Sequence, residues 1–204
     1  IYRVWVWTGG TPYDVVELPP LTPEAMAAYQ AYDPLRDDPV LECTLPGMPR
    51  VITIAGSRPL EFEQLGEDIL IHSQNYNRTR LIHMNAGVET SEMEATPLGY
   101  SRGRWEGDTL VVETANFNGQ WTLSGTGANM RLVERLTVTD TGTLAYEVTV
   151  EDAESFASPW TVSFPITRAT GPLYENACHE GNHSMPLILN GARAEERAQE
   201  ATSR

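Results

Sequence analysis

The sequence predicts a mainly β fold: an antiparallel barrel or strongly curved sheet, lipocalin-like in outline, with an extended N-terminal arm and short helices. From about residue 50 onward, short apolar segments are separated by turn residues such as Gly66-Glu67, Gly107-Asp108 and Asp140 to Gly142. Helical segments do not alternate with them, which favours antiparallel pairing. The 204 residues, 41% of them hydrophobic, suffice for one domain with a core. A closed barrel of about eight strands can hold one small ligand.

The first 50 residues are rich in proline, and we expect an arm that wraps the core. One helix is expected at about 22–32, because Thr22 can cap it and Pro23 suits the first helical position. Strands are expected at 50–55, 59–65, 68–74, 79–85, 108–115, 129–139, 143–151, 159–168 and 172–179.

These strands make up a β core over residues 50–190. The C-terminal 191–204 segment is helix-prone but polar, and we interpret it as a solvated or frayed tail. No repeat or second domain is visible, so residues 1–204 are expected to form a single domain.

The charge composition restricts the function. Acidic residues number 28 against 14 basic ones, and every basic residue is Arg. The lack of lysine excludes Schiff-base and phosphate-loop lysines, and a net charge of −14 disfavours nucleic acid and anionic membranes. No segment approaches the ~18 apolar residues of a membrane span. We expect a small neutral or cationic partner and no membrane insertion, and the sequence leaves open a homo-oligomer.

Glu134 is out of place in the 129–139 strand. Met130, Leu132, Leu136 and Val138 share a face by alternation, and Glu134 lies in the middle of it. A carboxylate on an apolar face requires a partner or protonation. Arg80, Arg104 or Tyr146 could be that partner, either in a structural pair or in a site where Glu134 contacts a ligand or catalyses.

Two histidines lie in the predicted hairpin between Ile69 and Met84. With its tip at Asn77-Arg78, His72 would face His83, which would allow a metal or a shared ligand between them. A slip of one residue would send the two imidazoles to opposite faces. The alternative is two exposed surface histidines, pointing away from the more apolar face.

The segment from Cys178 to His183 concentrates polar groups. His179 to His183 matches H-E-x-x-H, but Gly181 disfavours the helix that a zinc site needs and no third ligand follows at a familiar spacing. His179 beside Glu180 suits acid–base chemistry. The alternative is a turn whose polar side chains, Asn182 among them, are merely satisfied. Cys178 and Cys43 are either one disulfide or two separate thiols.

Nucleotide and nucleophile-elbow motifs are lacking: no G-x-G-x-x-G follows a strand into a helix, and no G-x-S-x-G is present. No organic cofactor is therefore implied.

A series of motifs resembles a large uncharacterised family of exported bacterial proteins. The matching stretches are 98–114 (LGYSRGRWEGDTLVVET), 116–117 (NF), 129–137 (NMRLVERLT), 159–161 (PWT), 174–182 (YENACHEGN) and 189–193 (LNGAR). The resemblance implies export to the periplasm or secretion, and a Cys43–Cys178 disulfide, but no reaction. Members often carry Tyr where this chain has His183, which counts further against the zinc motif.

Three functional hypotheses follow. The first is an exported enzyme (a lyase, isomerase or hydrolase) without metal, in which His179 is the general acid or base, Glu134 or Glu180 assists it, and Tyr100, Arg104 or Arg80 stabilises negative charge. The second is a non-catalytic barrel that binds an apolar or aromatic ligand. Its mouth would be lined by Trp105, Trp121, Trp160 and Tyr146. The third is a metal site built from His72, His83 and either His179 or His183.

Overall fold

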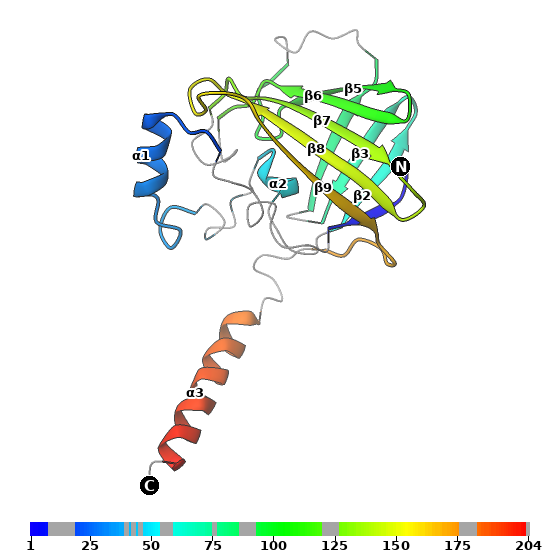
Figure 1. Ribbon diagram of the computed structural model, residues 1–204. Coiled ribbons are helices and arrows are strands. Elements are labelled where there is room, and N and C mark those ends of the chain that lie inside the picture. Colours follow the sequence, from blue (N-terminus) through cyan, green and yellow to red (C-terminus); the bar gives the residue numbers. More distant parts are fainter. Residues whose placement is uncertain are drawn as a thin grey trace.

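Nine strands form a closed barrel, which confirms the predicted β fold (Figure 1). The computed structural model describes residues 1–7, 19–38, 41, 44, 47–53, 59–74, 77–85, 93–119, 127–175 and 183–202. The strands are β1 (Val4–Val6), β2 (Leu60–Leu65), β3 (Asp68–Ser73), β4 (Arg78–His83), β5 (Tyr100–Glu106), β6 (Thr109–Ala115), β7 (Arg131–Val138), β8 (Thr143–Glu151) and β9 (Trp160–Arg168).

Two of these strands were not predicted. β1 lies in the supposed wrapping arm, and it closes the barrel by pairing with both β2 and β9. β5 contains Gly103 and several charged residues, so its composition does not predict a strand. It forms the one parallel pair of the described barrel, with β4, whereas all other neighbouring strands are antiparallel.

The strand directions define two ends of the barrel. Because β4 and β5 are parallel and every other pair is antiparallel, β2, β4, β5, β7 and β9 all begin at one end. We call this the helical end, because α1 and α2 lie there (Figure 1). The opposite end, here the turn end, carries the tight turns at Gly66 and Gly107, whose φ angles of 63° and 60° suit glycine.

The segment predicted as a strand at 50–55 is instead a short helix, α2 (Arg50–Thr53). Met48 and Val51 are 0% and 5% exposed and belong to the barrel core. A short apolar run is compatible with either a buried strand or a buried helix. Here Val51, together with Met48 just before α2, packs in the core.

The helix predicted at 22–32 is confirmed as α1 (Pro23–Ala31). Thr22 Oγ1 accepts a hydrogen bond from the Ala25 N–H at 3.2 Å, and Pro23 occupies the first turn. Thr22 also donates to the Glu154 carbonyl at 3.0 Å, so the cap anchors α1 to the β8–β9 connection.

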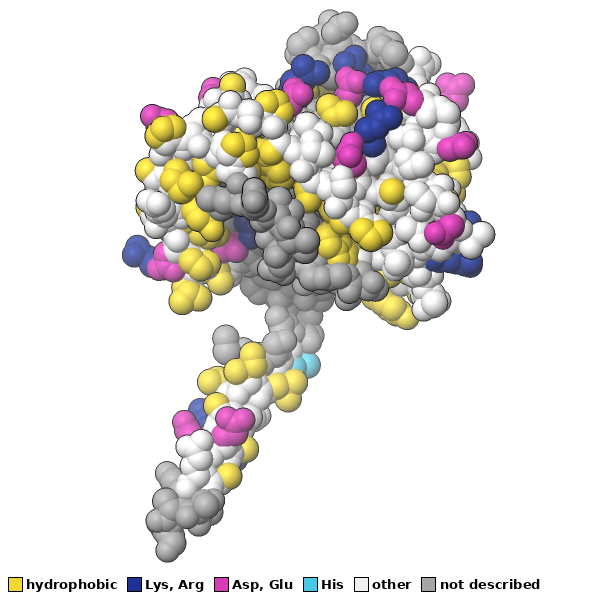
Figure 2. Space-filling model, viewed as in Figure 1, with side chains coloured by type: hydrophobic (Ala, Val, Ile, Leu, Met, Phe, Trp, Pro, Cys, Tyr) yellow, Lys and Arg dark blue, Asp and Glu magenta, His cyan; other side chains and the backbone are white. Residues whose placement is uncertain are grey.

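The C-terminal helix α3 (Ser184–Thr202) begins seven residues before the predicted tail and stands clear of the barrel (Figure 1). Its hydrophobic side chains are in contact with solvent (Figure 2), and Leu187, Ile188 and Leu189 are 66%, 64% and 47% exposed. The described part of the strand predicted at 172–179 is not a strand. Among the described helices, none combines the length and apolar character needed to cross a membrane.

Candidate functional site

A charged pair lies in the middle of the barrel. Arg80 of β4 and Glu134 of β7 both point inward and are 6% and 1% exposed. Arg80 Nη1 donates to Glu134 Oε1 at 3.0 Å, and Arg80 Nη2 donates to Oε2. The Tyr146 hydroxyl of β8 donates to Oε1 at 2.8 Å. The prediction that Glu134 has a partner among Arg80, Arg104 and Tyr146 is therefore confirmed for Arg80 and Tyr146.

The remaining donors of Arg80 are also used. Nε donates to Ser101 Oγ and Nη2 to Thr114 Oγ1, each at 2.8 Å, and Nη1 lies 3.8 Å from the Met48 sulfur. A guanidinium has five N–H groups, and each of the five has an acceptor here. Such a saturated arrangement supports a structural role for the pair.

The histidine pair was predicted in the wrong register. His72 faces Thr79, and continuing the same register places Asp68 opposite His83, so the tip of the hairpin lies two residues earlier in the chain than expected. The two imidazoles remain on the outer face but are four residues apart along β3, about 13 Å at the rise of a strand. A metal or ligand held between His72 and His83 is therefore excluded.

Each histidine instead has local partners. His72 Nε2 lies 3.1 Å from Glu63 Oε2, and its Nδ1 lies 3.0 Å from Thr79 Oγ1. His83 Nδ1 lies 3.7 Å from an Asp68 oxygen. Within the described residues, no group of three or more His, Cys, Asp and Glu could hold a metal.

Tyr100 and Arg104 lie on the outer face of β5, away from Glu134. The Tyr100 ring stacks on His83 with centroids 4.5 Å apart. Arg104 pairs with Glu113 and with Glu106, and these carboxylates raise the pKa of Arg104. Hydrogen bonds from Arg104 and Arg135 hold the pKa of Glu106 below its usual value. Arg104 as a partner of Glu134 was therefore a wrong expectation.

The predicted aromatic residues are separated along the barrel. Tyr146 and Trp160 point into the barrel and are 1% and 9% exposed, whereas Trp105 at the turn end is 46% exposed. His183 is exposed, directly before α3. Other predicted site residues lie outside the described residues: Cys43, Trp121, Cys178, His179, Glu180 and Asn182.

The helical end carries a feature that was not predicted. Three buried side-chain atoms of the described residues lack a hydrogen-bond partner: Ser73 Oγ, Arg78 Nε and Trp160 Nε1. β3 ends at Ser73, while β4 begins at Arg78 and β9 at Trp160, so all three belong to this end. The sequence held one signal for this feature. Ile69, Ile71 and Ser73 alternate along the predicted strand, so Ser73 shares the inward face of the two isoleucines.

Ser73 and Arg78 are directly paired across β3 and β4. Both point inward, Ser73 is 6% exposed, and burial lowers the pKa of Arg78. Trp160 stands edge-on to Phe156, with ring centroids 5.6 Å apart. A hydroxyl, a guanidinium N–H and an indole N–H are thus buried at one end of the barrel without a described acceptor or donor.

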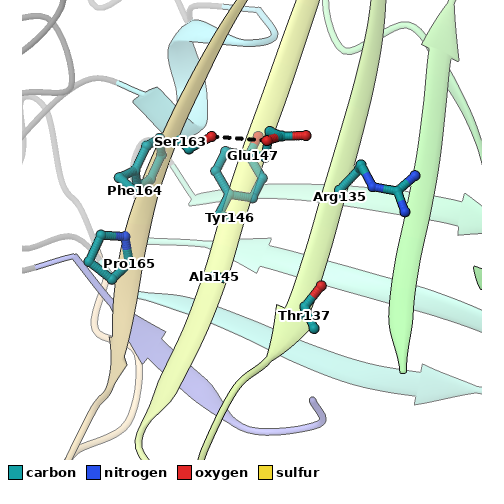
Figure 3. Close-up of a pocket in the computed structure, with 8 residues that line it drawn as sticks. All are labelled: Arg135, Thr137, Ala145, Tyr146, Glu147, Ser163, Phe164 and Pro165. Atoms are coloured by element: carbon teal, nitrogen blue, oxygen red, sulfur yellow. Dashed lines mark hydrogen bonds between the residues drawn. The ribbon is translucent and has the colours of Figure 1, made fainter. Parts of the chain in front are cut away.

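A shallow hollow of about 420 Å³ lies on the outer face of β7, β8 and β9 (Figure 3). Its polar groups are already engaged in part, since Ser163 Oγ donates to Glu147 Oε2 at 3.1 Å. The outward side chains around it are Arg135, Thr137, Ala145, Glu147, Ser163 and Pro165.

Comparisons with known proteins add no identity: no protein-family profile matches the chain, and no curated protein matches it significantly.

Proposed function

We propose that this protein binds a small molecule at the helical end of its barrel and does not transform it. The observation that carries the proposal is the set of unpaired buried atoms of Ser73, Arg78 and Trp160. Leaving a buried polar group unpaired costs about 1–3 kcal/mol, and folded proteins contain few such groups. A ligand that supplies the missing partners recovers this free energy on binding.

The central charged pair is less suited to chemistry. Glu134 accepts from both Arg80 and Tyr146, and it is almost wholly buried. A general base must reach its substrate within hydrogen-bond distance. We therefore interpret Glu134 as a structural anchor beneath the site.

The first test needs no ligand. Ser73→Ala removes an unpaired hydroxyl, so we expect the free energy of unfolding to rise by about 1 kcal/mol. Ser101→Ala is the matched control: it removes the acceptor of Arg80 Nε and should lower the free energy of unfolding by about 1–3 kcal/mol. Urea denaturation measures both, and a loss of stability in Ser73→Ala similar to that in Ser101→Ala contradicts a vacant site.

Binding itself is followed through the Trp160 indole N–H resonance, assigned with a Trp160→Phe variant. Benzamide, benzoate and phenol are the probes, and the proposal requires that at least one of them shifts this resonance. Recovery of a probe in chemically altered form overturns the proposal in favour of an acid–base enzyme. In that case His179→Ala, and then Glu180→Gln, should abolish turnover while the protein stays folded.

Export to the periplasm or secretion is also proposed, supported by the motif resemblance and the two cysteines. We expect a Cys43–Cys178 disulfide, and an intact mass two hydrogens below that of the reduced chain under non-reducing conditions. Two free thiols that react with iodoacetamide in the native, unreduced protein would exclude the bridge.

A further inference from the structure

Arg78 is an inward-facing arginine without a carboxylate. It follows the alternation of Arg80 and Ile82 on β4, and it is half-buried at the helical end. Its Nε is buried and unpaired, and none of the described residues forms an ion pair with it. Burial lowers its pKa, with no neighbouring anion to oppose the shift. A half-buried cation in this state is less stable than one with a counter-charge.

The next arginine inward shows what is missing. Arg80 lies two residues further along the same face of β4, and it donates hydrogen bonds to both oxygens of Glu134. The Tyr146 hydroxyl completes the environment of that carboxylate. Both oxygens of Glu134 are thus engaged by Arg80, and Glu134 forms no described hydrogen bond with Arg78.

Arginines outnumber carboxylates over the whole inner face of the barrel. By the alternation of the nine strands, the charged residues of the inward register are Arg78, Arg80, Arg168 and Glu134. Arg168 is exposed at the turn end, so inside the barrel the half-buried Arg78 and the buried Arg80 share one carboxylate, although the chain as a whole carries a net charge of −14. The acidic side chains of these strands occupy the outer face. The excess positive charge inside the barrel would attract an anion.

The neighbouring unpaired groups suit an anion. Ser73 lies directly across from Arg78, and its hydroxyl can donate to an oxygen beside the guanidinium. The Trp160 N–H at the same end is a donor only, so it also requires an acceptor. A carboxylate offers two oxygens with several lone pairs and matches the planar guanidinium.

We infer that the ligand of the helical end carries a carboxylate, and that Arg78 binds this carboxylate with Ser73 beside it. This inference rests on the proposed binding function. It departs from the neutral or cationic partner that the net charge of the chain favours, because the local charge of the barrel interior is opposite to that of the whole molecule.

The test compares benzoate with its uncharged analogue benzamide, and adds acetate and phenylacetate as further carboxylates. The readout is the Arg78 Nε–H resonance together with that of the Trp160 indole. We expect at least one carboxylate to shift the Arg78 resonance, and benzoate to bind about tenfold or more tightly than benzamide, as for a charge-assisted hydrogen bond. Arg78→Gln should remove that preference, and Arg168→Gln, at the turn end, should keep it.

The outcomes separate the two proposals. If benzamide and benzoate bind equally and both shift the Trp160 resonance, the binding site stands and the carboxylate inference is wrong. Persistence of the benzoate preference in Arg78→Gln also overturns the role of Arg78. If no compound shifts either resonance, both proposals fail.

Discussion

Two arginines that are two residues apart on one strand show how the environment divides their roles. Arg80 is held by Glu134, Ser101 and Thr114, and its charge is compensated inside the barrel. Arg78 faces the same way but lies nearer the helical end and has no such partners. The first stabilises the fold, and the second is the residue through which we propose that the protein recognises its ligand.

The Arg80–Glu134 pair gives a prediction at the scale of the residue. Glu134→Gln keeps the shape of the side chain but leaves the buried guanidinium uncompensated. We expect the free energy of unfolding to fall by about 3–5 kcal/mol, measured by urea denaturation. Glu113→Gln breaks the exposed pair with Arg104 and should cost less than about 1 kcal/mol. Equal, small losses in the two variants would show that the buried pair contributes little.

At the scale of the element, β5 shows how a strand can form against its composition. Its parallel contact with β4 brings Gly103 close to Ile82 and Met84. A Cβ at position 103 would lie 2.7 Å from Ile82 Cγ2 and 2.5 Å from Met84 Sδ. The glycine therefore permits the close approach of β4 and β5 at their parallel junction.

Gly103→Ala tests this account. We expect the added methyl group to lower the free energy of unfolding by about 1–3 kcal/mol, because it forces the Ile82 and Met84 side chains to move. Gly171→Ala is the control, since nothing lies within 4 Å of a Cβ built there. Thermal unfolding monitored by circular dichroism compares the two. A Gly103→Ala protein as stable as the control would mean that β4 and β5 adjust freely.

At the scale of the whole molecule, charge is segregated between the faces of the barrel. Acidic residues outnumber basic ones two to one, yet the charged side chains inside the described barrel are the buried Arg80 and Glu134 and the half-buried Arg78. Closure of the sheet produces this contrast, because it turns one face of every strand toward a common interior. The ligand that we propose would therefore meet a local charge opposite to the average of the chain.

The part of the structure that the sequence determined is local. Alternating apolar residues determined most strands, Thr22-Pro23 determined the start of α1, and the apolar surroundings of Glu134 determined that it must be paired. These features depend on a few neighbouring residues and on rules of alternation and capping that operate within one element.

The tertiary structure decided what depends on partners far apart in the chain. The register of β3 and β4 separated His72 from His83, and Val51 packs into the core from a helix rather than from a strand. Closure of the barrel placed Ser73, Arg78 and Trp160 at one end. A one-residue change of register, or an unexpected strand such as β5, changes which distant residues meet. The alternation of apolar residues within each strand stays the same.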